Sequence, residues 1–185
     1  MPKLVILDRD GVINHDSDEY IKSPDEWKPI EGSLEAIARL NQAEYRVVVI
    51  TNQSGLARGF FMLDDLNQIH QKMHQQLAEV NGRIEAIFFC PHSNKENCNC
   101  RKPRTGLYQE LANCLGIPLN DIPAVGDSLR DLQAASAVGA QPILVLTGKG
   151  QQTLRMKEEL YNIPVYENLA AFVDSFLASL GEKTV

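Results

Sequence analysis

The sequence predicts an α/β fold: a doubly wound, Rossmann-like parallel sheet with helices on both faces. Short apolar, β-branched runs alternate with longer segments in which apolar residues recur every three or four positions. Such alternation is typical of strand–helix–strand units built around a parallel sheet. The 185 residues, 44% of them hydrophobic, suffice to bury one core, so we expect a single domain over residues 1–185.

Five segments are predicted to be buried strands, because each is a short and nearly continuous apolar run: residues 3–7, 47–50, 84–89, 122–125 and 142–146. The clearest helix is predicted over residues 63–80, where apolar side chains form one stripe and Asn81-Gly82 ends it. Ser33 is predicted to cap an earlier helix. Further helices are predicted over about residues 106–115, 129–138 and 169–180.

The overall charge excludes one class of partner. A net charge of -6 and a pI near 5.2 argue against a nucleic-acid surface, which needs clustered Lys and Arg. The first apolar run stops at Asp8 after four residues, too short for a signal peptide or a membrane span, so we expect a cytoplasmic protein. Nothing in the composition marks an interface, and a monomer acting on a small molecule is the default expectation.

Polar residues follow several predicted strands, at the edge where ligands of parallel sheets bind. Alone, each motif has a simpler interpretation, since Asp-x-Asp is common in turns and a threonine can cap a helix. Their recurrence at successive strand ends indicates a site instead. The motifs are Asp8-Arg9-Asp10-Gly11, Thr51-Asn52-Gln53-Ser54-Gly55, Arg101-Lys102-Pro103 and Gly126-Asp127-Ser128, with Asp131 one helical turn beyond.

These residue types together fit phosphoryl transfer. A carboxylate can act as the nucleophile and a second carboxylate can move protons, while hydroxyl, amide and lysine groups bind phosphoryl oxygens. Carboxylates also hold hard cations, and Mg²⁺ is the expected ion because it prefers an oxygen shell completed by water and substrate phosphate.

In order and spacing, Asp8-Arg9-Asp10-Gly11, Thr51-Asn52-Gln53, Lys102 and Gly126-Asp127 resemble the four motifs of the haloacid dehalogenase superfamily. The resemblance spans most of the chain and implies a phosphatase that forms an aspartyl-phosphate intermediate. It implies that Asp8 attacks phosphorus, that Asp10 is the acid and base, and that Thr51 and Lys102 steady the phosphoryl group. It further implies that Mg²⁺ is held by Asp8, the main-chain carbonyl of Asp10, and Asp127.

A separate metal site is predicted in the loop after residue 89. Cys90, His92, Cys98 and Cys100 offer three sulfurs and one imidazole in a loop too short for a core of its own. Four such ligands make a closed, structural Zn²⁺ site. The simpler alternative is a reduced, metal-free loop. Cys114 has no partner nearby and is predicted to fill the core.

This loop and the segment Thr51 to Gly59 resemble a branch of the superfamily that acts on heptose bisphosphates in bacterial surface-polysaccharide synthesis. The resemblance implies hydrolysis of the 7-phosphate with retention of the 1-phosphate. Ser128 departs from relatives that carry lysine there. No insertion is long enough for a cap domain. The implied substrate-binding residues are Asp16, Glu19, Tyr20, Thr51, Asn52, Gln53, Ser54, Arg101 and Lys102.

Three alternatives stay open from the sequence. A histidinol-phosphate phosphatase has similar motifs and a similar zinc loop, a phospho-accepting receiver domain has a similar sheet, and a zinc-stabilised nucleic-acid module is opposed by the acidic charge. Other residues receive a structural interpretation: His70 and His74 as a solvated or packed helix face, Trp27 as a packing anchor, and Gly148-Lys149-Gly150 as a turn. Arg58 is assigned either to substrate or to a surface acid.

Overall fold

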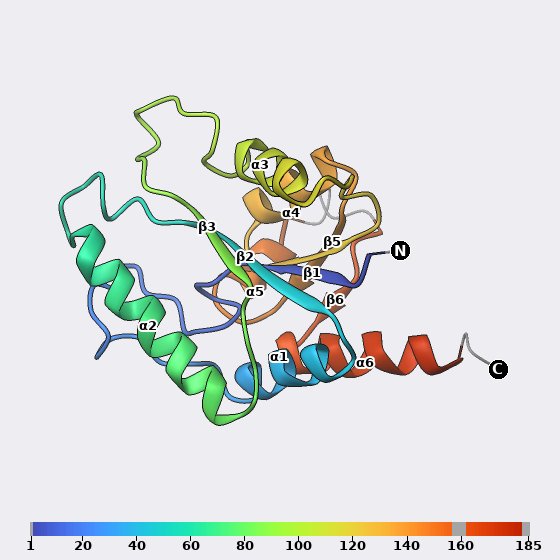
Figure 1. Ribbon diagram of the computed structural model, residues 1–185. Helices are drawn as coiled ribbons and strands as arrows, with labels where there is room; N and C mark the ends of the chain where they lie inside the picture. The colour runs from blue at the N-terminus through green and yellow to red at the C-terminus, as the bar shows by residue number, and fades with distance from the viewer. Residues whose placement is uncertain (1, 157–161, 183–185) are drawn as a thin grey trace.

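A computed structural model describes residues 2–156 and 162–182 of the protein (Figure 1). At its centre is a sheet of six parallel strands in the order β3-β2-β1-β4-β5-β6. The strands are β1 (Leu4–Leu7), β2 (Arg46–Asn52), β3 (Ala86–Cys90), β4 (Pro123–Gly126), β5 (Gln141–Val145) and β6 (Val165–Tyr166). The doubly wound parallel sheet predicted from the sequence is therefore confirmed.

Helices cover both faces of the sheet, with α1 and α6 on one side and α3 and α4 on the other (Figure 1). The helix α2 packs on the α1 side, where its buried residues join the same core cluster. The helices are α1 (Ser33–Gln42), α2 (Leu63–Glu79), α3 (Gly106–Leu115), α4 (Leu129–Ala137), α5 (Gly150–Leu154) and α6 (Leu169–Glu182).

The alternation of side chains along β1 shows how one strand serves two cores. Val5 and Leu7 point into the cluster under α1, α2 and α6, whereas Leu4 and Ile6 point into the cluster under α3 and α4. All four side chains are buried, which explains why a central parallel strand reads as an uninterrupted apolar run.

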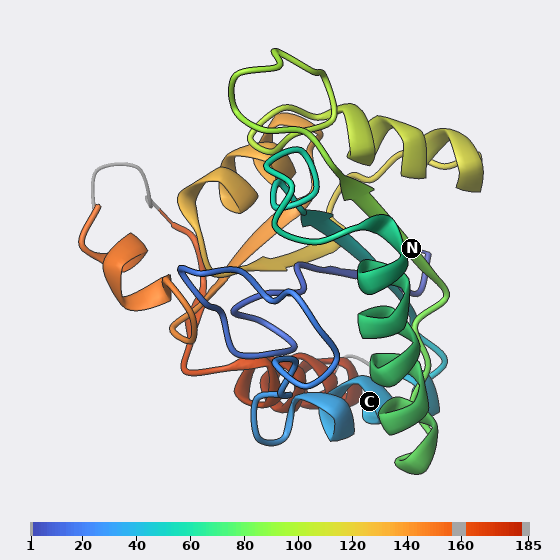
Figure 2. The same ribbon diagram turned by 90° about the vertical axis from the view of Figure 1, so that its left-hand side faces the viewer.

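The strand order reverses between β1 and β4, and this position is the switch point where open α/β sheets bind ligands. From β1 the chain proceeds outward to β2 and β3, and then returns to place β4 on the other side of β1. Figure 2 looks toward the carboxyl edge, where the loops that follow β1, β2 and β3 gather. No cap domain is inserted in the described chain, as predicted.

Several local predictions need correction. Gly32, not Ser33, caps α1, because the Ser33 hydroxyl donates to the carbonyl of Ile13 at 2.7 Å and ties α1 to the loop after β1. Cys114 is exposed rather than part of the core. The short elements β6 and α5 were not predicted. Trp27 is fully buried and is a packing anchor, as expected.

Within residues 2–156 and 162–182, no helix combines the length and the apolar character needed to cross a lipid bilayer.

Replacing Met73 with alanine tests the core under α2. Met73 is fully buried among apolar neighbours, so the Met73→Ala variant should lose about 2–5 kcal/mol of unfolding free energy. Gln75→Ala, at an exposed position of the same helix, should change it by less than about 0.5 kcal/mol. Denaturant titration of the two variants measures the difference, and equal losses would contradict this description of the core.

Candidate active site

A cavity of about 270 Å³ opens at the carboxyl edge of the sheet, beside the switch point. Its wall combines the ends of β1, β2 and β4 with the loops that follow β1, β2, β3 and β5 and the first turn of α4. The residues that line it are Asp8, Asp10, Asp16, Ser17, Asp18, Tyr20, Ile21, Thr51, Asn52, Gln53, Ser54, Arg58, Arg101, Lys102, Asp127, Arg130 and Lys149. The structure thus brings together every residue predicted for catalysis, magnesium binding and substrate binding except Glu19.

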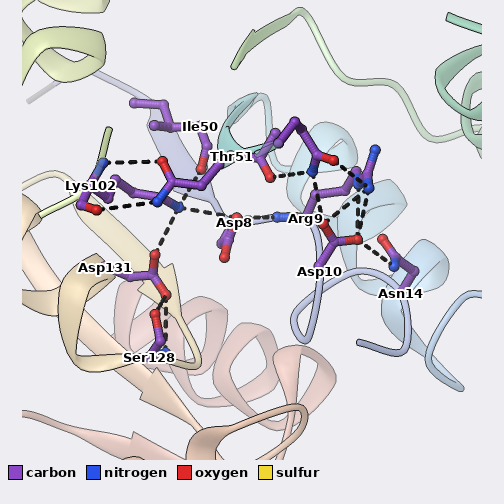
Figure 3. Close-up of polar contacts among 11 residues, drawn as sticks. Asp8, Arg9, Asp10, Asn14, Ile50, Thr51, Lys102, Ser128 and Asp131 are labelled. Atoms are coloured by element: carbon purple, nitrogen blue, oxygen red, sulfur yellow. Dashed lines mark hydrogen bonds and ion pairs between the residues drawn. The ribbon is translucent and has the colours of Figure 1, made fainter. Parts of the chain in front are cut away.

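Lys102 lies between two carboxylates at the floor of this cavity (Figure 3). Its Nζ is 3.1 Å from Asp8 Oδ1 and 2.8 Å from Asp131 Oδ1, and it donates to the carbonyl of Ile50 at 2.7 Å. Burial alone would lower the pKa of Lys102, but the charges of Asp131 and Asp8 outweigh it and raise this pKa above its usual value. Lys102 therefore stays protonated and fixes the position of Asp8.

Asp10 is held by neutral and charged donors on the opposite side of Asp8 (Figure 3). Arg9 Nη2 donates to both of its carboxylate oxygens, Asn14 Nδ2 donates to Oδ1 at 2.9 Å, and Gln53 Nε2 donates to Oδ2 at 2.8 Å. Burial acts to raise the pKa of Asp10, but the Arg9 charge and these hydrogen bonds prevail and lower it. Within this network Asp10 is ionised and its orientation is fixed.

Two glycines allow the third carboxylate, Asp127, to approach the end of β1. A Cβ at Gly11 would stand 2.1 Å from Asp127 Oδ2, and one at Gly148 would stand 2.2 Å from the same atom. Gly11 also has φ +85°, which other residues rarely adopt. The main-chain N–H of Lys149 donates to Asp127 Oδ2 at 2.7 Å, so the turn after β5 fixes this side chain.

The carboxylates of Asp8, Asp127 and Asp131 place oxygens within 4.8 Å of one another, an arrangement that fits a hard cation. Burial and the neighbouring carboxylates raise the pKa of Asp8 to about 6 and that of Asp127 to about 8. A divalent ion removes this repulsion, and an all-oxygen ligand set suits Mg²⁺. Asp8 and Asp127 belong to the predicted ligand set, whereas the role of the Asp10 carbonyl stays a prediction.

The polar residues at the end of β2 and just after it line the cavity and also hold other site residues in place, while their contact with substrate stays a prediction. Both amide atoms of Asn52 bond the main chain of Lys102, at 3.1 and 3.2 Å, and each keeps one further hydrogen-bonding position. The Gln53 amide bonds Arg9, Asp10 and the Thr51 hydroxyl in the same way. Thr51 Oγ1 accepts from Gln53 Nε2 at 3.0 Å, which leaves the Thr51 proton for an acceptor in the cavity.

Glu19 is the predicted substrate residue that the structure places elsewhere. Tyr20 has a positive φ of 66°, and its N–H donates to Ser17 O, so the chain turns sharply at this point. Glu19 lies in an adjoining hollow with Tyr20 and Lys22, and its side chain is exposed. We therefore correct the prediction for Glu19, while Asp16 and Tyr20 line the cavity as expected.

Two of the four cations at the mouth of the cavity were not predicted to belong to the site. Arg130 and Lys149 line it together with Arg58 and Arg101. The sequence carried a signal for both missed residues. Arg130 lies in the first turn of the helix that follows Asp127, and Lys149 follows a predicted strand end, as the other site residues do. Lys149 also lies 3.4 Å from Asp16, so it joins the loops after β1 and β5.

The zinc ligands predicted in the loop after β3 converge on one point. Cys90 Sγ lies 3.6 Å from Cys98 Sγ and 3.1 Å from Cys100 Sγ, and His92 Nδ1 lies 3.2 Å from Cys100 Sγ. Tetrahedral Zn²⁺ with bonds of about 2.3 Å requires ligand atoms about 3.8 Å apart. All four ligand atoms lie within 4.8 Å of one another, and the cysteines are free thiols, so this set fits Zn²⁺.

This loop continues directly into the active site. Arg101 Nη1 donates to the carbonyl of His92 at 3.3 Å, and the next residue, Lys102, is clamped by Asn52 at the end of β2. Gly106, at the start of α3, donates to the carbonyl of Asn99 at 3.0 Å. The loop is thus anchored on both sides, and the ligand set lies within two residues of the cavity wall.

Comparisons with known proteins bear on the identity of this site. A family model described as polynucleotide kinase 3 phosphatase matches residues 3–128, and one described as HAD-hydrolase-like matches residues 99–172. A protein of Bordetella bronchiseptica named D-glycero-beta-D-manno-heptose-1,7-bisphosphate 7-phosphatase is 54% identical over 95% of this chain and 98% of its own. The chain belongs to the heptose bisphosphate phosphatases of the haloacid dehalogenase superfamily.

Other members of this phosphatase family agree. A Pseudomonas aeruginosa protein of the same name is 48% identical over 94% of this chain and 97% of its own. The crystal structure of the B. bronchiseptica D,D-heptose 1,7-bisphosphate phosphatase complexed with magnesium and phosphate matches with a TM-score of 0.94 and 53% identity, covering 96% of this chain and 99% of that one. Membership in a phosphatase family sets aside the receiver domain and the nucleic-acid module.

The buried Lys102 pair leads to a stability prediction. Asp131→Ala leaves the buried ammonium of Lys102 with Asp8 as its one carboxylate partner, and losing this charge-assisted contact should cost about 1.5–3 kcal/mol of unfolding free energy without magnesium. The control Glu85→Ala breaks the exposed pair with Arg46 and should cost less than about 1 kcal/mol. Urea titration measures both, and similar small losses would contradict the role given to Asp131.

The zinc ligand set leads to a second prediction. The purified protein should contain about one zinc per chain, because a closed four-ligand site binds this ion tightly. Cys98→Ser should lose most of the zinc, whereas Cys114→Ser, at an exposed thiol outside the cluster, should retain it. Elemental analysis after gel filtration checks both variants. A wild-type protein free of zinc would contradict the assignment.

Proposed function

We propose that this protein removes the 7-phosphate of D-glycero-β-D-manno-heptose 1,7-bisphosphate in bacterial surface-polysaccharide synthesis, and leaves the 1-phosphate in place. The observation that carries the proposal is the convergence of Asp8, Asp10, Thr51, Lys102 and Asp127 at one cavity. Relatives that are about half identical over nearly the whole chain are named for this reaction and for the β anomer.

The chemistry follows from the two fixed carboxylates. Asp10 is ionised before substrate arrives, and the negative charge of the bound phosphate beside it favours uptake of a proton. An oxygen of Asp8 then attacks phosphorus, the bond to the sugar oxygen breaks, and Asp10 gives this proton to that oxygen. Asp10 then takes a proton from water, whose oxygen attacks the phosphorus of the aspartyl phosphate. Inorganic phosphate leaves, Asp8 is regenerated, and Asp10 again carries a proton.

Lys102 and Thr51 act on the transferred group. The Lys102 ammonium and the free proton of the Thr51 hydroxyl stabilise negative charge on the phosphoryl oxygens, and both groups are held rigidly before substrate arrives. When bound at Asp8, Asp127 and the Asp10 carbonyl, Mg²⁺ supplies further neutralisation of that charge. Lys102 also keeps Asp8 oriented toward phosphorus, because its Nζ contacts the carboxylate oxygen Oδ1.

The cations at the mouth explain a preference for a bisphosphate. The cavity is also lined by four cations that are separate from the residues proposed to act on the transferred phosphate: Arg58, Arg101, Arg130 and Lys149. We propose that they receive the 1-phosphate, because guanidinium and ammonium groups are the common partners of phosphate oxygens. Histidinol phosphate carries a cationic amine instead of a second phosphate, so these four residues disfavour it as the substrate.

The setting proposed for the enzyme is a cytoplasmic monomer of one domain over residues 1–185. Free cysteines and a thiolate-rich ligand set are compatible with a reducing compartment. One sheet carries all the residues proposed for catalysis, which supports a single working unit.

The proposed nucleophile leads to a direct test. Asp8→Asn should be folded but inactive toward the heptose bisphosphate in the presence of Mg²⁺, because an amide cannot form the phosphoryl-enzyme intermediate. Asp25→Asn, at an exposed position that does not line the cavity, should retain wild-type activity. Released inorganic phosphate measures turnover, and phosphatase activity in Asp8→Asn would refute the assignment.

The proposed 1-phosphate site leads to a specificity test. Arg101→Met should lower kcat/KM for the heptose bisphosphate by about 10- to 100-fold, the effect of losing one charge-assisted contact. The same change should affect the corresponding 7-monophosphate by less than about threefold. A panel with both heptose anomers and histidinol phosphate, ranked by kcat/KM, completes the test. A wild-type preference for histidinol phosphate would overturn the proposed substrate.

A further inference from the structure

Arg9, between the two aspartates of the first motif, is fully buried and is bound to Asp10 through two of its nitrogens. Nε lies 3.1 Å from Asp10 Oδ1, and Nη2 lies 2.9 Å from Oδ1 and 3.0 Å from Oδ2. A planar guanidinium that meets a carboxylate in this way restricts the rotation of the carboxylate. The orientation of Asp10 thus depends on where Arg9 itself is held.

The third guanidinium nitrogen of Arg9 is held by His70. Its Nη1 lies 3.1 Å from His70 Nε2. A guanidinium can only donate, so Nε2 must accept, and the ring proton must be on Nδ1. Burial and the Arg9 charge lower the pKa of His70 to about 3, in agreement with a neutral ring.

The position of His70 is itself well fixed. It lies on α2, and its neighbours Ile69 and Met73 are fully buried in the core that α2 shares with the sheet. A contact of Arg9 with this helix therefore ties the guanidinium to a rigid element on the side away from Asp8. His74, one turn later on the same helix, is exposed.

We propose that His70 is a positioning residue for the acid and base Asp10, and that it acts through Arg9. This inference rests on the proposed function, in which Asp10 gives a proton to the sugar oxygen and later takes one from water. Both transfers require an Asp10 oxygen within hydrogen-bond reach of its partner, and a small displacement of a reacting group is costly. His70 does not touch the cavity, so it influences proton transfer rather than substrate binding.

Three variants separate this role from a general structural one. His70→Phe keeps a ring but removes the acceptor, so kcat should fall about 10- to 100-fold while KM stays within about twofold. His70→Gln restores an acceptor oxygen and should recover most of the lost kcat. His74→Phe, the matched control, should behave as the wild type. Circular dichroism verifies that each variant is folded.

A second measurement does not depend on activity. Nitrogen-15 NMR of the histidine rings in the wild-type protein should assign the Nδ1-protonated neutral tautomer to His70, whose signal is identified by its absence from His70→Gln. If His70→Phe does not fold, the kcat of His70→Gln and the tautomer of His70 in the wild-type protein decide whether the inference holds. A protonated Nε2 would overturn the inference, as would an unchanged kcat in His70→Phe, a loss confined to KM, or a His70→Gln variant as slow as His70→Phe.

Failure of this inference is distinguishable from failure of the proposed function. A wild-type enzyme inactive on the heptose bisphosphate counts against the proposed substrate alone. The three variants are then compared on the best phosphate ester of the substrate panel, since Asp10 would serve the same two proton transfers for any sugar phosphate.

Discussion

The structure depends on the balance of charge at the carboxyl end of β1. Four buried or nearly buried carboxylates, those of Asp8, Asp10, Asp127 and Asp131, meet where three strands end. Two buried cations pair with three of them: Lys102 forms ion pairs with Asp8 and Asp131, and Arg9 forms an ion pair with Asp10. Asp127 receives a main-chain N–H but no side-chain cation within the described network, and this is the side on which Mg²⁺ fits.

Because the two cations are divided in this way, neighbouring carboxylic acids have different protonation states. Asp10 is kept ionised and oriented, whereas the pKa of Asp8 and of Asp127 is raised as long as a cation is lacking. Burial is common to all three residues, so the difference comes from their partners. The two cations reach the site from different parts of the chain, Arg9 within the first motif and Lys102 from the end of the zinc loop. A well-placed zinc loop is therefore a condition for a well-placed nucleophile.

Much of the fold and of the site could be predicted from the sequence. Central strands are buried on both faces, so their apolar runs fixed the strand positions to within about two residues. The strand β6 was missed because it is a two-residue edge strand with an exposed valine. Site residues at strand ends could be predicted because a parallel sheet brings those ends together, independently of the conformation of the loops.

What the sequence could not provide is the pairing of side chains distant in the chain. Asn52 and Gln53 were predicted only to meet substrate, and the sequence did not reveal that the first also clamps Lys102, 50 residues away, and the second holds Asp10, 43 residues away. Glu19 was predicted at the cavity, whereas the loop that turns at Tyr20 places it in an adjoining hollow. Hydrogen bonds of this kind leave no periodic pattern, so only coordinates reveal them.

The close fit of Gly11 and Gly148 around Asp127 has an evolutionary consequence. Any amino-acid substitution at either position adds a Cβ where Asp127 already lies, so we expect both positions to stay glycine as long as Asp127 is required. Gly59, on the segment that leads from β2 to α2, has open space around it, so only its φ of +71° favours glycine there. New substrate preferences can therefore arise in the outer loops, where side chains can change without displacing Asp127.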